Sequence, residues 1–582
     1  QFIKRKLSMK DKKEFFKLLE EIDGKPIEEF TKIIGDYDFT RYVIKCYPFD
    51  ANSENCNTVF SLRIPQTISE IPEFLFNSSV RKTALEDYLL RGFNSSVDKI
   101  AEFDYNGIAR KNINISSPDQ KILPRNTVVI TREFIEIRFE VELPVQQILI
   151  EDGIFLAIDG GRMQDLFFED LMESISDSLL YCNMDKDDEI SFLNNMEDAS
   201  ALRDYLLSSG QVSFLEHGSL IRRDFLSDQP DYVSSSPLEI DDSLMQTIST
   251  PNLGDINGLV IPSGLTVIVG ESYDGRIDLI DSISQGIYNH IPGDGREHCV
   301  TVSDAVEINT EPGRTVQNVD ISHFIKNDDS YKCFTSDSAN AYESQAASLV
   351  ESLEAGSRVL IFDEENSSSS FLSSDSRLSN LQQGSSLCPL SAIARSLVDQ
   401  LGISIIVSGS SLIAEFIPVA DKIYKIKNSK VTDITNEAKE LEIDSNVDNT
   451  HEDLSSILSK SRWIMPSSID PSDKYDDVSV YIYNNVHLKF GRSIIDLKYN
   501  SQISSIDQIR TIGMILYYAK LRYMDEGYSL KEILDLVDRD LSNEGLNILT
   551  RDICGNLARP RRHEIASLIN RLPAFRVSHV TE

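Results

Sequence analysis

The stretch that decides the fold runs from Leu265 to Asp281 and reads Leu-Thr-Val-Ile-Val-Gly-Glu-Ser-Tyr-Asp-Gly-Arg-Ile-Asp-Leu-Ile-Asp. Its first five residues are apolar and mostly β-branched, which is typical of a buried strand. Gly270 and Gly275 bound the loop that follows, and isoleucines then recur at helical spacing. A phosphate-binding loop occurs in this context of strand, glycine-bounded loop and helix. The sequence therefore predicts a nucleotide-binding α/β core built around this segment.

The loop itself departs from the phosphate-binding motif, which requires Gly-x-x-x-x-Gly-Lys-Ser/Thr. Arg276 stands at the lysine position, and Ile277 stands where a hydroxyl would bind Mg²⁺. Glu271 and Asp274 place negative charge where phosphate oxygens would lie. Phosphate binds to backbone N–H groups that glycine allows to approach closely, so bulky or acidic side chains oppose binding. The four changes together favour a loop that keeps its turn without its nucleotide.

Two further apolar segments predict strands of the same sheet. One ends in Asp363 and Glu364, and the other, Ile403–Val407, ends in Ser-Gly-Ser-Ser. Three buried strands separated by helices indicate a parallel sheet, whose ligands gather at the carboxyl ends of the strands. In nucleotide-binding folds an acid at this place holds Mg²⁺ and a second acid polarises water. Asp363 is the candidate Mg²⁺ ligand, and both acids are candidate catalytic residues.

Composition limits the possible functions of the chain. It has 582 residues, of which 41% are hydrophobic, and a formal net charge of −36 that opposes non-specific nucleic-acid binding. Its seven cysteines are scattered, which is typical of free thiols in an intracellular protein. A run of about 18 apolar residues is absent from the sequence, so we expect no membrane span. We expect an intracellular, cytoplasmic protein.

Changes in pattern along the chain predict four parts. These are an α+β N-terminal accessory domain (1–245), the core (246–440), an acidic linker (441–477) and a C-terminal domain (478–582). In the first part, Val80–Phe93 has a helical pattern that a glycine would end, and two segments alternate as strands do, Thr127–Thr131 and Phe134–Leu143. The last part begins with a strand pair near Val478–Phe490, followed by helices at about Ser505–Asp525, Ser529–Leu541 and Arg562–Arg571.

Several segments resemble the family of predicted ATPases of the ABC class. The most specific is Gly286–Glu297, which reads Gly-Ile-Tyr-Asn-His-Ile-Pro-Gly-Asp-Gly-Arg-Glu. The other similar segments are Arg81–Arg91, Leu143-Pro144, Gly313-Arg314, Val319–Ile325, Ser344–Ala347, Glu351–Gly356, Phe490-Gly491, Ile495–Leu497 and Leu557–Ala566. The resemblance therefore covers nearly the whole chain.

This resemblance implies an α/β multidomain fold with an ABC-type P-loop core, a mixed α+β N-terminal domain and a small α+β C-terminal domain. It implies ATP and Mg²⁺ as ligands, a dimer with ATP between the phosphate loop and the signature segment of the partner, and RNA as a further possibility. Eight positions correspond to the family's nucleotide contacts: Gly270, Tyr273, Asp274, Gly275, Arg276, Ile277, Ser344 and Gln345.

The signature segment departs from the family pattern as the loop does. The family pattern is Ala-Ser-Gly-Ser-Thr-Ser-Gln-Ala, and this chain has Ala-Asn-Ala-Tyr-Glu-Ser-Gln-Ala at 339–346. Ala341 replaces the glycine that would bring the backbone close to a γ-phosphate, and Glu343 adds negative charge. Asp363 and Glu364 are the catalytic-type residues that remain.

Two main hypotheses follow, and whether ATP is hydrolysed stays open between them. The first is a non-catalytic scaffold or partner-binding subunit with a degenerate ATP site, acting through a protein partner, a homodimer or a heterodimer. The second is a functional ATPase, linked to RNA or nucleic-acid binding, in which Arg276 holds phosphate and Glu364 positions water.

Two smaller alternatives also remain. The ring of Tyr273 either stacks on adenine or packs in the turn. Three arginines near the C-terminus form either a nucleic-acid patch or the paired charges of a helix start: Arg559, Arg561 and Arg562.

Overall fold

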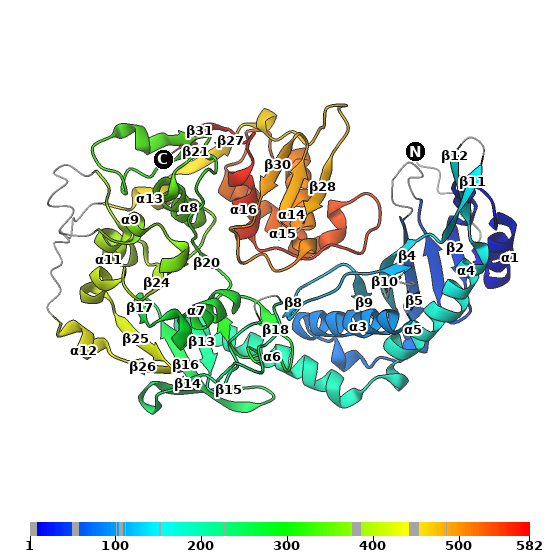
Figure 1. Cartoon of the computed structure of the whole chain (residues 1–582), viewed down its shortest axis with the longest axis horizontal. Helices are drawn as coiled ribbons and strands as arrows, with labels where there is room; N and C mark the ends of the chain where they lie inside the picture. The colour runs from blue at the N-terminus through cyan, green and yellow to red at the C-terminus, as the bar shows by residue number, and fades with distance from the viewer. Residues whose placement is uncertain are drawn as a thin grey trace. The chain divides into compact units, whose positions relative to one another are not determined.

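The structure is a computed structural model, drawn in Figure 1, that describes residues 9–48, 57–100, 102–103, 109–110, 112–150, 153–224, 227–374, 386–441, 453–484 and 486–581. The chain forms two compact units. The first comprises Gln1–Asn194 and Gly545–Arg559, and the second comprises Asn195–Glu544 and Pro560–Glu582.

The first unit is built on a seven-stranded sheet with the order β1-β2-β3-β4-β10-β7, and β9 pairs with β10. Its central strands, β4 (Asn57–Pro65) and β10 (Phe134–Glu142), are antiparallel over their whole length. The alternating segments predicted as strands are confirmed as β9 (Val128–Ile130) and β10. Further elements of this unit include β1 (Lys10–Asp11), α1 (Lys12–Ile22), β2 (Gly35–Asp38), β3 (Val43–Cys46), β7 (Ile113–Asn114), α4 (Gly160–Asp165) and α5 (Leu171–Leu179).

The helix predicted over Val80–Phe93 is longer than the sequence suggests. Helix α3 spans Ser79–Lys99 and continues through Gly92, so the prediction of a glycine stop is wrong. A glycine ends a helix by adopting a left-handed φ, and Gly92 does not. A Cβ at this position would lie 3.5 Å from the Cβ of Ser178 on α5, so the glycine lies at the packing contact of two helices.

The second unit contains the predicted parallel sheet. Its strand order is β14-β26-β25-β17-β24-β23-β20, and β25, β17, β24, β23 and β20 run parallel. The three strands expected from the sequence lie side by side at its centre. The strands are β14 (Glu239–Ile240), β17 (Leu265–Val269), β20 (Ala305–Glu307), β23 (Val359–Asp363), β24 (Ser404–Gly409), β25 (Lys422–Lys427) and β26 (Lys430–Asp433).

Helices α8 (Ala341–Glu354) and α11 (Leu390–Leu401) share one apolar core with this sheet. Alternate residues of β17, β23 and β24 enter that core, because side chains one residue apart on a strand point to opposite faces. Helix α7 (Arg276–Gln285) follows β17, as predicted. A second sheet, in the order β15-β16-β13-β19, consists of β13 (Gln211–Glu216), β15 (Met245–Thr250), β16 (Gly254–Pro262) and β19 (Val300–Thr301).

The C-terminal part has one strand more than the predicted pair. Its antiparallel sheet contains β28 (Val480–Asn484), β29 (His487–Phe490) and β30 (Ser493–Asp496). The three predicted helices are confirmed as α14 (Ile506–Arg522), α15 (Leu530–Glu544) and α16 (Arg562–Arg571).

Part of the stretch predicted as a linker, 441–477, has regular structure, and residues 442–452 lie outside the described residues. Leu454 and Ile457, the latter on α13 (Ser456–Ser459), are buried in the apolar core of the sheet. Strand β27 (Ser461–Ile464) pairs with β31 (Val577–Thr581) near the end of the chain.

Six cysteines in the described part of the chain are free, as expected. Among the described residues, none of the helices has the length and apolar character that crossing a membrane requires.

Candidate functional site

The loop between β17 and α7 keeps the turn expected from its two glycines. Ser272–Asp274 forms a single 3₁₀ turn, and Gly275, with φ 98°, begins α7. Glycine is the residue that adopts this φ readily. At Gly270 a Cβ would lie 2.7 Å from the carbonyl oxygen of Ile426. Packing and backbone conformation therefore require both glycines, whether or not the loop holds a ligand.

Arg276, at the lysine position of the motif, turns inward and is fully buried. Its Nη1 donates to the Asp363 carboxylate and, at 2.9 Å, to the Ser408 hydroxyl. Its Nη2 donates to Glu365 Oε1 at 2.8 Å and to Ser272 Oγ at 3.3 Å. The two terminal nitrogens of the guanidinium thus bind two different carboxylates of the same chain, which the planar fork of arginine allows.

Asp363 lies at the carboxyl end of β23, where the sequence places the Mg²⁺ ligand. Its carboxylate accepts from Arg276, so the guanidinium supplies there the positive charge that a metal would bring. Burial raises the pKa of Asp363, and the adjacent guanidinium only partly opposes that rise.

Glu364, the candidate catalytic acid, is bound to the turn after β24. Its carboxylate accepts from the Ser410 hydroxyl at 2.7 Å and from the backbone N–H groups of Ser411 and Leu412 at 3.0 Å each. Burial alone would raise the pKa of Glu364, but these hydrogen bonds lower it below its ordinary value. Both oxygens of the ionised group are therefore in use as a cap for the turn.

Glu365 is a site residue that sequence reasoning missed. Besides Arg276, it accepts from the Ser272 hydroxyl in the loop. Its place directly after the two predicted acids was the signal in the sequence that pointed toward it. Its pairing with Arg276 depends on the burial of that guanidinium, which the sequence did not show.

Ser344 and Gln345, predicted to contact nucleotide from the signature segment, are completely buried. Gln345 Nε2 donates to the Ile308 carbonyl at 3.2 Å and to the Ser367 hydroxyl at 2.8 Å. The Ser344 hydroxyl accepts from the Glu311 backbone N–H at 3.0 Å. Both side chains connect α8 to neighbouring loops and leave no group facing a ligand.

The N-terminus of α8 carries its own anion. Asn340 and Glu343 form a reciprocal capping box: Asn340 Oδ1 accepts from the Glu343 N–H at 2.9 Å, and Glu343 Oε2 accepts from the Asn340 N–H at 3.0 Å. Glu343 Oε1 also accepts from the Tyr331 hydroxyl at 3.2 Å. Helix N-termini attract phosphate through free N–H groups and the helix dipole, and here a carboxylate already meets that demand.

The outer side of the loop is exposed. Tyr273 is 83% exposed, which contradicts the alternative in which its ring packs in the turn, and Ile277 is 37% exposed. The Asp274 carboxylate accepts from the Asn428 N–H at 3.2 Å, and its carbonyl accepts from the Ser429 N–H at 3.0 Å. These contacts hold the loop on the turn between β25 and β26.

The residues present do not fit Mg²⁺-ATP. The charge that should hold phosphate faces two carboxylates, and the hydroxyl that should bind Mg²⁺ is an isoleucine. Within the part of the chain that the structure describes, no group of three or more His, Cys, Asp or Glu side chains is placed to hold a metal ion.

The segment Gly286–Glu297 has a structural role in the same unit. Arg296 is buried and donates through Nε to the Ile221 carbonyl at 2.9 Å, and Asp294 pairs with Arg223 at 2.6 Å and with His290 at 2.7 Å. The polar residues of this segment therefore close a tight turn.

Two of the C-terminal arginines are engaged with acids. Arg561 pairs with Glu564 at 2.6 Å and Arg562 with Asp535 at 2.7 Å. Both contacts favour the paired helix-start charges over a nucleic-acid patch.

Three family models match the chain. The N-terminal model for an ATPase of the ABC class matches residues 12–182, the ABC ATPase P-loop domain matches residues 185–462, and the MRB1590 C-terminal domain matches residues 483–578. None of the curated proteins matches the sequence. Among solved structures, cbiO1 from Clostridium perfringens, part of the ABC transporter complex cbiONQ, is 12% identical over 38% of this chain and 87% of its own, with a TM-score of 0.23.

Proposed function

Because the chain belongs to the ATPases of the ABC class, we propose that it is a non-catalytic member of that class whose nucleotide site is filled by its own side chains. In this proposal it acts as a scaffold or partner-binding subunit. The observation that carries the proposal is the buried guanidinium of Arg276, which binds Asp363 and Glu365 in place of a phosphate.

The energetic argument rests on the cost of opening this ion pair. Removing one partner of a buried ion pair typically costs about 3–5 kcal/mol, because the other charge is left without compensation. A phosphate would have to break the contacts of Arg276 and then approach the negative charges of Glu271 and Asp274. Neither cost is offset by a metal, because Ile277 brings no hydroxyl to bind one.

A calorimetric titration of the purified protein with Mg²⁺-ATP tests the proposal. We expect no saturable heat at micromolar nucleotide, and the same result for Ile277→Ser, because the restored hydroxyl leaves Arg276 committed to its acids. Saturable heat that Arg276→Ala abolishes and the surface variant Arg492→Ala retains would overturn the proposal.

The second candidate is a working ATPase linked to RNA. It is favoured by one observation, the position of Asp363 and Glu364 at the carboxyl end of β23. Release of phosphate from ATP by the protein, lost in Glu364→Gln, would favour this candidate. Retention of a labelled single-stranded RNA at physiological salt would add the RNA link.

A further inference from the structure

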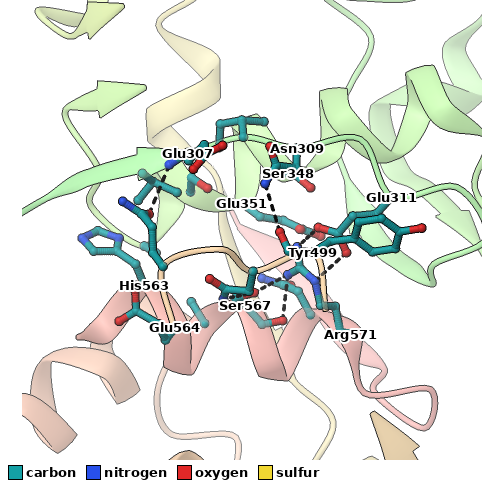
Figure 2. Close-up of a pocket in the computed structure, with 18 residues that line it drawn as sticks. Glu307, Asn309, Glu311, Ser348, Glu351, Tyr499, His563, Glu564, Ser567 and Arg571 are labelled. Atoms are coloured by element: carbon teal, nitrogen blue, oxygen red, sulfur yellow. Dashed lines mark hydrogen bonds and ion pairs between the residues drawn. The ribbon is translucent and has the colours of Figure 1, made fainter. Parts of the chain in front are cut away.

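A small polar cavity lies between β20, α8 and α16, with the segment 499–502 along its side (Figure 2). Its volume is about 40 Å³. A water molecule needs roughly 10–15 Å³ measured in this way, so the cavity admits an occupant the size of one to three waters. The labelled side chains in Figure 2 come from the core above, from α16 below and, at Tyr499, from the segment 499–502, and all of them are polar or charged.

The carboxylates around the cavity are balanced by arginines with one exception. The pairs are Glu311 with Arg571, Glu351 with Arg314 at 2.8 Å, and Glu564 with Arg561 at 2.6 Å. Glu307 is the fourth acid in the lining, and among the described residues no cationic side chain pairs with it. The lining and its partners therefore carry one uncompensated negative charge.

The contacts of Glu307 come from hydroxyl groups. Its Oε2 accepts from Ser284 on α7 at 2.8 Å and from Ser501 at 2.7 Å. Burial raises the pKa of Glu307, the hydrogen bonds from Ser501 and Ser284 oppose that rise, and the negative charges of Asp281 and Asp363 add to it. Burying the ionised carboxylate here is therefore costly unless a positive charge or a proton compensates it.

The histidine beside the cavity does not supply that charge. Burial lowers the pKa of His563 well below its ordinary value, and the charges of Arg561 and Arg562 act in the same direction. The imidazole is therefore neutral at physiological pH, and the compensating charge has to come from outside the chain or from a proton.

A buried oxygen without a hydrogen-bond partner among the described residues also lines this cavity. Asn309 is only 9% exposed, and its Nδ2 donates to the Tyr499 carbonyl at 3.1 Å. Its Oδ1 is buried and has no hydrogen-bond partner among the described residues. A buried oxygen without a partner typically costs about 1–3 kcal/mol, which an occupant that bound it would recover.

We propose that this cavity is a binding site for one monovalent cation, held by the Glu307 carboxylate and the Asn309 side-chain oxygen. Hard cations prefer oxygen ligands, and one positive charge balances the single uncompensated carboxylate. The proposal is independent of whether the chain binds nucleotide. Its structural consequence is that the cation is bound by the two side chains that already hydrogen-bond to the segment 499–502, Glu307 to Ser501 and Asn309 to Tyr499.

Thermal unfolding at pH 8 in four chloride salts of equal concentration tests the proposal. The salts are those of potassium, sodium, ammonium and N-methylglucamine, the last of which is too large for the cavity. We expect at least one small cation to raise the Tm by roughly 2–5 °C over N-methylglucamine, saturably with concentration. In Glu307→Gln the four salts should give one Tm.

Glu437→Gln is the matched control, because it removes an exposed carboxylate from α12 (Thr435–Lys439) and should keep the response of the unchanged protein. If Glu307→Gln does not fold, Asn309→Ala replaces it and should shrink the difference between the salts. Equal Tm values for the unchanged protein in all four salts would overturn the proposal, and so would a salt difference that survives in Glu307→Gln. In either case the cavity holds water and a proton neutralises Glu307.

Discussion

Asp363 and Glu307 end two neighbouring parallel strands, β23 and β20, yet the protein treats their charges differently. Burial raises the pKa of both carboxyl groups. Asp363 faces a buried guanidinium, whereas Glu307 faces two serine hydroxyls. A strand end that carries an acid therefore does not by itself define a metal site, because the partner brought there by the fold decides what the acid binds.

The difference also explains why the positive charge at the end of the altered loop, that of Arg276, is already paired. Arg276 enters from α7 and binds the acid at one strand end, while the acid of the next strand stays accessible to a cavity. A side chain of the same chain compensates the charge of Asp363, whereas among the described residues no cationic side chain compensates that of Glu307.

Removing Arg276 from its pair with Asp363 should have the largest effect on stability. Arg276→Ala leaves Asp363 buried without its cation, so we expect the free energy of unfolding to fall by about 3–5 kcal/mol in urea denaturation. Arg492→Ala, which removes a guanidinium that is 66% exposed, should cost less than about 0.5 kcal/mol. Equal losses in the two variants would contradict the comparison.

Replacing Glu307 should have a smaller effect on stability, and that effect should depend on pH. The raised pKa means that the protonated form of Glu307 suits the fold, so its stabilising contribution is present at low pH and lost as pH rises through the raised value. In N-methylglucamine chloride we expect Glu307→Gln to be about 1 kcal/mol more stable than the unchanged protein at pH 8. The two proteins should converge toward pH 4. Parallel stability curves over this range would argue against an uncompensated charge.

Replacing Glu364, whose carboxylate caps the turn after β24, should have the smallest effect on stability, and its pH dependence should have the opposite sign. The lowered pKa of Glu364 means that its contribution is present above the ordinary carboxyl value and lost as pH falls through the lowered one. Glu364→Gln should cost about 0.5–1 kcal/mol at pH 7, since solvent weakens a partly exposed charge, and nothing near pH 2. A variant more stable than the parent at pH 7 would refute the capping role.

Local patterns in the sequence were sufficient for the elements that carry the site. The apolar run before Gly270, the acid-tipped strand and the helix from Arg562 to Arg571 all appear as expected. The prediction at Gly92 failed because glycine also occurs where two helices pack closely, and a single sequence does not separate that cause from a helix end.

Local patterns in the sequence could not predict which distant residues pair in the folded protein. Glu365 meets Arg276 across 89 positions, and Ser501 meets Glu307 across 194 positions. Hydrogen-bond geometry at that separation depends on strand order and helix placement, which are properties of the assembled core.

Residue type and spacing in the sequence by themselves predicted a nucleotide-binding α/β core whose loop departs from the phosphate-binding motif at four positions, and the resemblance to a known family supplied the ABC class. Only the tertiary structure decided which partners the charged side chains of the core have. It turned Arg276 inward onto Asp363 and Glu365, and it placed Glu307 beside a cavity, where its described partners are serine hydroxyls. The physical reason is that the energy of a buried charge depends on the partners and the solvent within a few ångströms, and folding brings those together.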